Sequence, residues 1–292
     1  MDIKISVIIP TLNAEKELPL LLAALKNQKH PIDELIVVDS ASSDRTVEIC
    51  KADPSIILLQ IERADFDHGR TRDMAIRHSI GDIVVFLTQD AVPANEYFLT
   101  NLLAPFSEHG VAISTGRQLP KPDASPMEKL IRSFNYPEEG YIRSKDDLST
   151  MGIKTFFSSD VCAAYDRKVY LELGGFDYPI KTNEDMFFAA KVINAGYRIA
   201  YASNAIVYHS HNFSLKEQYK RNYIQGYEIE RHREVLHNVS LNSEGMKLVK
   251  YVSKELLRRG EIISFIHFGF DCVVRLIGNR AGKKAYLQRK AM

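Results

Sequence analysis

From Ile5 to Gly116 the sequence alternates short runs of β-branched and apolar residues with segments whose leucines and alanines recur at helical spacing. This alternation is typical of βαβ units around a parallel sheet, because each helix carries the chain back to begin the next strand at the same edge. The sequence therefore predicts an α/β fold with a Rossmann-like, mostly parallel sheet and helices on both faces. The expected strands are 5–10, 34–40, 56–61, 83–90 and 111–116, and the expected helices between them are 14–28, 46–52 and 71–80.

Length and composition fit a soluble globular protein with a substantial core. Of the 292 residues, 45% are hydrophobic and 26% are charged, which excludes a mainly disordered chain. The three cysteines, Cys50, Cys162 and Cys272, are far apart, so we expect neither a disulfide framework nor a zinc ribbon. The apolar run 3–9 is too short for a secretory signal and lacks a basic lead, which favours a cytoplasmic location.

Prolines mark a change of organisation after the fifth expected strand. Pro120, Pro122, Pro126 and Pro137 predict a long irregular excursion over 119–137. Sheet character returns near 155–167, a helix is expected over 183–196, and a last strand over 198–211 ends in two histidines. The rest of the chain reads as helical and basic: from residue 221 to the last residue it has fourteen lysines and arginines against seven aspartates and glutamates.

Polar residues follow the expected strands at their carboxyl ends, where open α/β sheets bind ligands. Neither G-x-G-x-x-G nor a P-loop motif follows the first strand. Asp39, after the second strand, can accept hydrogen bonds from a base or ribose, or it can cap a helix. Asp90, after the fourth strand, suits a hard cation such as Mg²⁺ or Mn²⁺ bound to a diphosphate, although an aspartate that forms a turn has the same position.

Two adjacent acids, Glu184 and Asp185, stand at the expected start of a helix. The positive end of the helix dipole stabilises carboxylates there, so capping accounts for one of them. Two acids that closely follow the segment GGFD (174–177) favour a loop that presents a carboxylate as a base.

Five segments of the chain together resemble a known enzyme family. SVIIPTLN, LIVVDSASSDRT, FLTQDA, GGFD and NED occur in the order found in inverting, family 2 nucleotide-sugar glycosyltransferases, which have the GT-A fold. The resemblance implies a catalytic domain over 1–212, with a nucleotide-sugar-binding half (1–116) and an acceptor-binding half (117–212), and leaves 213–292 as a helical C-terminal extension. It implies donor-binding roles for Pro10, Thr11, Asn13, Asp39, Arg72, Gln89 and Asp90, and acceptor-side positions for Gly175, Phe176 and Glu184.

The same resemblance assigns the metal and the base. Asp90 would hold Mg²⁺ or Mn²⁺ and Asp185 would deprotonate the acceptor hydroxyl. The usual metal motif of the family is Asp-x-Asp, whereas here Thr88 occupies the first position. His209 or His211 would then supply the further ligand, although a histidine that is merely paired or exposed beside a strand is the alternative.

The segment FDHGRTRDMA (66–75) resembles the F-x-H-G-x-T-R-N-x-A segment of bacterial rhamnosyltransferases of this family, with Asp73 in place of asparagine. Arg72 at the start of a helix would reach the nucleotide or its phosphates. The donor implied is dTDP-L-rhamnose, and the acceptor a glycan or a polyprenyl-diphosphate-linked glycan. Two alternatives remain open: a UDP-hexose or UDP-HexNAc donor, and a non-catalytic protein that binds a sugar nucleotide or glycan.

The segment 261–278 is apolar but contains His267, Asp271 and Arg275, so we expect it not to span a membrane. Every charged residue after Asp271 is basic, which favours a peripheral helix on an anionic membrane surface at the inner face of the cell membrane. A helix packed on the catalytic domain, or on a second copy in a homodimer, is the alternative. Nucleic acid is not an expected partner, because no recognisable binding module accompanies the basic residues.

Overall fold

The computed structural model of the chain describes residues 3–236 and 242–291. The strands are β1 Ile5–Thr11, β2 Glu34–Asp39, β3 Ile56–Gln60, β4 Ile83–Leu87, β5 Val92–Pro93, β6 Val111–Leu119, β7 Tyr141–Arg143, β8 Cys162–Asp166 and β9 Arg198–Tyr208. The helices are α1 Leu18–Lys26, α2 Thr46–Lys51, α3 His68–His78, α4 Phe98–Leu103, α5 Pro126–Asn135, α6 Leu148–Met151, α7 Arg167–Glu172, α8 Glu184–Asn194, α9 Leu215–Arg231, α10 Asn242–Arg258 and α11 Ile262–Lys290.

The strands form one sheet in the order β3-β2-β1-β4-β8-β6-β9-β5, with β7 paired to β9. The first four positions, β3, β2, β1 and β4, are parallel neighbours, as the alternating sequence predicts. β8 is antiparallel to both β4 and β6, and β6 is parallel to β9, so the second half of the sheet is mixed. Because β1, β2 and β4 are parallel, their carboxyl ends meet at one edge of the sheet.

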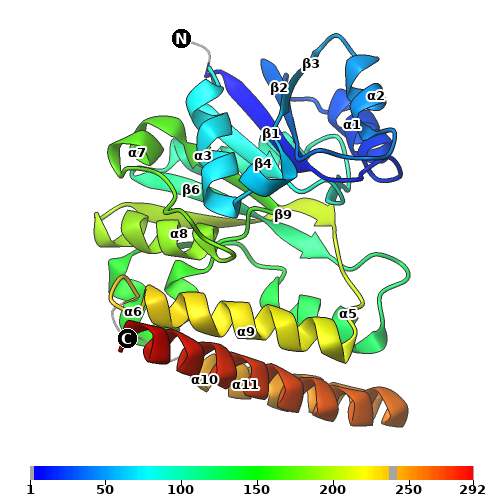
Figure 1. The fold of residues 1–292 in the computed structure, drawn as a ribbon, viewed down its shortest axis with the longest axis vertical. Helices are drawn as coiled ribbons and strands as arrows, with labels where there is room; N and C mark the ends of the chain where they lie inside the picture. The colour runs from blue at the N-terminus through cyan, green and yellow to red at the C-terminus, as the bar shows by residue number, and fades with distance from the viewer. Residues whose placement is uncertain (1–2, 237–241, 292) are drawn as a thin grey trace.

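Helices cover both faces of the sheet, which confirms that part of the prediction (Figure 1). On one face, α3, α7 and α8 bury apolar side chains against residues such as Ile8, Val84 and Phe86. On the other face, α1, α2 and α4 pack on residues such as Val7 and Val85. Consecutive strand residues point to opposite faces, so a strand buried on both sides reads as the continuous apolar run seen in the sequence.

Two segments differ from the prediction, and local capping explains both. α3 begins at His68 because the side chain of Asp67 accepts hydrogen bonds from the backbone N–H groups of Gly69 and Arg70, at 3.1 and 3.0 Å. The expectation that 119–137 is wholly irregular is wrong, since it contains α5. Pro126 stands at the first turn of α5, where its missing N–H costs nothing, and the Ser125 side chain caps the helix.

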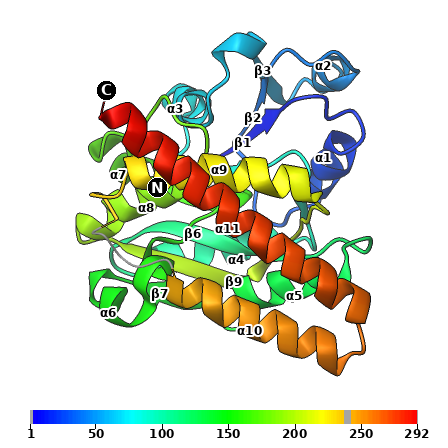
Figure 2. The ribbon, with the colours of Figure 1, turned by 60° about the horizontal axis from the view of Figure 1, so that its bottom comes forward.

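The C-terminal helices lie together against the rest of the protein, and α11 runs alongside α9 (Figures 1 and 2). Glycines permit the close approach of these two helices. A Cβ on Gly226 would overlap the carbonyl oxygen of Asn279, and one on Gly282 would overlap that of Tyr223. A separate apolar cluster joins α5 to α10 and α11 through residues such as Leu130, Val252, Leu256 and Phe268.

α11 continues to Lys290, beyond the segment considered in the sequence. By length and composition it is apolar enough to cross a membrane, with a mean hydropathy of 1.4 in its most apolar window. The expectation that the segment does not span a membrane stays a prediction. In the structure the helix packs on α9, and 17% of that window is buried within the protein.

Candidate active site

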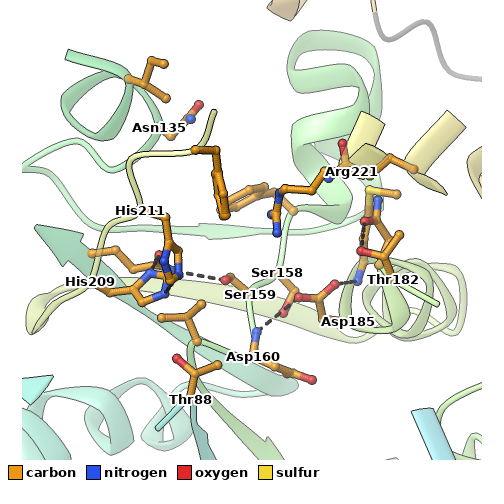
Figure 3. Close-up of a pocket in the computed structure, with 18 of the residues that line it drawn as sticks. Thr88, Asn135, Ser158, Ser159, Asp160, Thr182, Asp185, His209, His211 and Arg221 are labelled. Atoms are coloured by element: carbon orange, nitrogen blue, oxygen red, sulfur yellow. Dashed lines mark hydrogen bonds between the residues drawn. The ribbon is translucent and has the colours of Figure 1, made fainter. Parts of the chain in front are cut away.

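A cavity of about 530 Å³ opens at the carboxyl edge of the sheet. The loops after β4 and β9 form one wall, the start of α8 forms another, and α5, α9 and α11 close the side away from the sheet. Six of the predicted site residues meet here: Arg72, Asp90, Glu184, Asp185, His209 and His211. Figure 3 shows the two histidines on one side of the cavity and Asp185 on the other.

Asp90, His209 and His211 form a compact set of ligand atoms that lie within 4.8 Å of one another. The Nε2 atoms of His209 and His211 lie 3.4 and 3.3 Å from Oδ2 of Asp90. Lys121 Nζ is 3.6 Å from the same oxygen. Although burial alone would raise the pKa of Asp90, the two histidines and Lys121 hold it below the ordinary value. The carboxylate is therefore ionised at neutral pH.

A neighbouring network fixes the tautomer of His209. Nδ1 of His209 lies 3.1 Å from Oε1 of Gln118, and the same oxygen accepts a hydrogen bond from Nη1 of Arg132. A guanidinium only donates, so the end of the Gln118 amide that faces Arg132 is the oxygen. Because that oxygen accepts, Nδ1 of His209 must carry the proton. Burial lowers the pKa of His209 to about 3. Its Nε2 is therefore unprotonated and lies 3.1 Å from Nε2 of His211 and 3.4 Å from Oδ2 of Asp90, which is how a second partner prepares a histidine to bind a metal.

Across the cavity, Asp185 is held at the first turn of α8. Its Oδ1 accepts from the backbone N–H of Met186 at 2.7 Å, and its Oδ2 accepts from that of Asp160 at 3.2 Å. Burial, followed by the charges of Glu184 and Asp160, raises the pKa of Asp185 well above the usual carboxylate range. A carboxylate with a raised pKa is a stronger base than one in water, which is the property that general-base catalysis needs.

Arg72 lines the cavity from the first half of α3 and is paired with two acids. It is buried, with Nε 3.2 Å from Oδ2 of Asp160 and Nη1 3.2 Å from Oε1 of Glu184. The predicted contact of Arg72 with the nucleotide or its phosphates stays a prediction. In the structure the guanidinium holds Asp160 and Glu184, the two neighbours of Asp185, at fixed distances from a buried positive charge.

The remaining donor-side residues lie near the carboxyl ends of β1, β2 and β4 but not among the residues that line the cavity. Asp39 is buried and accepts from the backbone N–H of Ser42 at 2.9 Å, so it caps the turn after β2 and does not cap α2. The side chain of Gln89 bonds both backbone groups of Leu12. Nucleotide contacts stay predictions for five of these positions: Pro10, Thr11, Asn13, Asp39 and Gln89.

Gly175 and Phe176 are not on the acceptor side of the cavity. Phe176 is 2% exposed and packs edge-on against Tyr165, Tyr170 and Phe188 in the core. Gly175 has a φ of 73°, and a Cβ there would overlap Oδ1 of Asp73. Both residues serve the turn and packing that precede α8, so the expectation that they meet the acceptor is wrong.

Several residues of the cavity were missed in the sequence. Asp160 precedes β8, and Arg132, Arg221 and Arg275 come from α5, α9 and α11. Arg132 and Arg275 are paired with acids, whereas the Arg221 side chain lies over the ring of Phe213, 4.3 Å from its centroid. Burial and the charges of Arg275 and Arg132 lower the pKa of Arg221. Among the described residues it has no carboxylate partner, and it lies near the space between the histidines and Asp185 (Figure 3).

Comparisons with known proteins place the chain in a sequence family. Residues 6–174 match the model of glycosyl transferase family 2. The chain is 43% identical over 224 residues to the O-antigen chain rhamnosyltransferase RfbN of Salmonella typhimurium, which covers 76% of this chain and 71% of that protein. It is 42% identical over 204 residues to the O-antigen chain rhamnosyltransferase WbaN of Salmonella anatum, covering 70% of this chain and 64% of that protein.

Two solved structures have the same fold. A mannosyltransferase from Pyrobaculum calidifontis, in complex with GDP-Man and Mn²⁺, superposes with a TM-score of 0.63 at 17% identity, over 99% of this chain and 88% of that one. TarS 1–349 of S. aureus, in complex with UDP-GlcNAc, gives 0.57 at 20% identity, over 98% and 92%. At these identities the matches establish the fold alone.

Proposed function

Because this chain belongs to glycosyl transferase family 2, we propose that it transfers L-rhamnose from dTDP-L-rhamnose to a hydroxyl of an O-antigen-type polysaccharide precursor, with inversion at the anomeric carbon. The chain is a glycosyltransferase with a GT-A fold and a helical C-terminal extension. One observation carries the proposal further than family membership: a single cavity joins the Asp90, His209 and His211 cluster to the carboxylate of Asp185. The two O-antigen rhamnosyltransferase relatives support the choice of sugar.

Asp185 is the base of the proposed reaction. Its raised pKa lets it take the proton as the acceptor oxygen forms a bond to the anomeric carbon and the bond to the diphosphate breaks. Attack from the side opposite the leaving diphosphate inverts the anomeric carbon. Glu184 and Asp160 raise the basicity of Asp185, and Arg72 holds both of them in place.

The residues at the other end of the cavity fit a divalent cation. One carboxylate and two imidazoles, one of them with its Nε2 unprotonated, form a donor set that Mg²⁺ or Mn²⁺ accepts when a diphosphate supplies further oxygens. Such a cation would neutralise the charge of the donor diphosphate. Arg221, without a carboxylate partner among the described residues, would add a positive charge for the leaving group.

A donor panel tests the proposed function. The protein is incubated with dTDP-L-rhamnose, UDP-glucose, UDP-galactose or UDP-GlcNAc, with Mn²⁺ or with EDTA, and release of the nucleotide diphosphate is measured. We expect release from dTDP-L-rhamnose to exceed the others at least tenfold and to stop in EDTA. Preference for a UDP-sugar would favour the alternative donor class, and full activity in EDTA would contradict the metal site.

For the acceptor, we propose a lipid-linked glycan that the protein meets at the inner face of the cell membrane. α11 carries a row of apolar side chains spaced three and four residues apart, each more than half exposed: Ile263, Ile266, Phe270, Val273 and Ile277. An apolar row on a helix with a basic end suits the surface of an anionic bilayer. Burial of such side chains contributes roughly 1.5–3 kcal/mol each when it is complete.

Vesicle binding tests the membrane proposal. The double variant Ile266→Ser/Phe270→Ser should bind phosphatidylglycerol vesicles at least tenfold more weakly than the wild type. Leu20→Ser is the matched control, because Leu20 is 63% exposed but lies on α1, and it should bind like the wild type. If the double variant instead dissociates a dimer and leaves vesicle binding unchanged, the apolar row is a homodimer interface.

A further inference from the structure

A second cavity, of about 1010 Å³, lies along the C-terminal half of α9. The beginning of α3, residues 179–181 and the end of α11 form its other sides. It meets the active-site cavity at His68, which lines both. A chain-like acceptor whose hydroxyl reaches Asp185 would pass His68 to enter this second cavity, here called the α9 groove.

Aromatic side chains with polar edges form much of the α9 groove. Tyr223, Tyr227 and Tyr286 line it, together with Phe66. The rings of Tyr227 and Tyr286 meet edge to face with centroids 5.3 Å apart, and Nη1 of Arg289 donates to the hydroxyl of Tyr227 at 3.3 Å. Sugars combine C–H faces, which pack on the electron-rich faces of aromatic rings, with hydroxyls that bond to tyrosine and arginine.

The helices that carry these tyrosines hold a fixed spacing. A Cβ on Gly278 would come within 2.7 Å of the backbone oxygen of Tyr219, and Gly282 lies still closer to Tyr223. Lys283 on α11 also pairs with Glu230 on α9, at 3.2 Å. A groove built between two helices locked together in this way is formed before a ligand arrives, so binding costs little ordering.

We propose that the α9 groove binds an oligosaccharide: the sugars of the acceptor that lie beyond the one receiving the new residue. The proposal rests on the proposed function for the identity of the acceptor, but the binding itself does not require transfer. Binding in the α9 groove makes the protein sensitive to acceptor length. A single sugar occupies only the active-site cavity, whereas a longer glycan also gains the contacts of the groove.

A fluorescence titration tests binding without any reaction. The sequence contains no tryptophan, so Tyr286→Trp places the sole tryptophan in the groove and keeps an aromatic face there. Addition of a rhamnose-containing tetrasaccharide glycoside should change the emission of this tryptophan until the change saturates. Methyl α-L-rhamnoside should bind at least tenfold more weakly. Gln288→Trp is the matched control, because Gln288 is exposed on the same helix and does not line the groove.

An unchanged emission with both saccharides, or equal affinity for both, would overturn the proposal. A change produced only by phosphatidylglycerol vesicles would also overturn it, since the groove would then seat lipid. The titration uses no donor, so it reports saccharide binding even for a protein that does not transfer rhamnose. Failure of the proposed function and failure of the groove are thereby distinguishable.

Kinetics supply a second test. Tyr286→Ala should raise the KM for the tetrasaccharide acceptor at least fivefold and leave the KM values for the monosaccharide acceptor and the donor unchanged. If the alanine variant does not fold, Ala285→Trp, which fills the groove from α11, takes its place with the same expectation. Equal losses for both acceptor lengths, or no loss for either, would refute length sensitivity.

Discussion

Replacement of Arg72 by glutamine should destabilise the protein strongly at neutral pH and above. Arg72 is 6% exposed and lies 3.2 Å from a carboxylate oxygen of both Asp160 and Glu184. Removal of one partner from a buried ion cluster leaves uncompensated charge and costs roughly 3–5 kcal/mol, whereas loss of a surface pair costs about 0–1 kcal/mol. We therefore expect a loss of about 3–5 kcal/mol in the free energy of unfolding at roughly pH 8.

The loss should shrink as the pH falls. Burial, opposed by Arg72 and assisted by Glu184, raises the pKa of Asp160 to about 7, and without Arg72 that pKa rises further. A carboxyl group whose pKa is higher in the folded state than in the unfolded state destabilises the fold while it is ionised. Below the folded-state pKa the group is protonated in the fold, so the cost falls with the pH and is gone below the unfolded-state pKa. The deficit at roughly pH 5 should be smaller than that at roughly pH 8 by at least about 1.4 kcal/mol, the equivalent of one pKa unit.

Urea unfolding followed by circular dichroism measures both deficits. The matched control is Arg70→Gln, because Arg70 is exposed on the same helix and its guanidinium lies 5.5 Å from the ring centroid of Tyr178. The control should lose no more than about 1 kcal/mol at either pH. A deficit for Arg72→Gln below about 1 kcal/mol, or one that does not depend on pH, would refute the buried ion cluster.

Three further predictions test the packing and the site. Gly282→Ala should lower the free energy of unfolding by roughly 1–3 kcal/mol, because the new Cβ overlaps the carbonyl oxygen of Tyr223; an unchanged urea midpoint would contradict this contact. Ser125→Ala should lower the free energy of unfolding by about 1 kcal/mol through loss of the α5 cap, and a decrease below a few tenths of a kcal/mol would contradict the cap. Asp160→Asn should move the acid limb of the pH–rate profile to lower pH, since one of the charges that raise the pKa of Asp185 is removed; a shift to higher pH would contradict the assigned coupling.

The site was predictable from the sequence where chain order alone places residues together. Asp90 follows β4, whose carboxyl end shares an edge with those of β1 and β2, and Asp185 stands at a helix start that the acids themselves mark. Phe176 was misplaced because a motif does not reveal which way a side chain points, and here the apolar ring is buried in the core.

The rest of the site depends on contacts between distant segments. Asp160 reaches Arg72 only because β8 inserts antiparallel between β4 and β6, which the pattern of β-rich runs does not specify. Arg221 and Arg275 face the cavity because glycines let α11 pack closely on α9. In the sequence those arginines are part of a basic region, and nothing local distinguishes a cavity wall from a solvated tail.

The most direct test of the assigned site is Asp185→Asn, measured for both transfer and donor binding. The amide keeps the shape of the carboxyl group but cannot accept the proton, so transfer from dTDP-L-rhamnose should fall by about 10²–10⁴-fold. The dissociation constant for the donor in Mn²⁺ should stay within about threefold of the wild-type value, because Asp90, His209 and His211 lie across the cavity from Asp185. Transfer within about threefold of the wild type would contradict the role of Asp185 as the base.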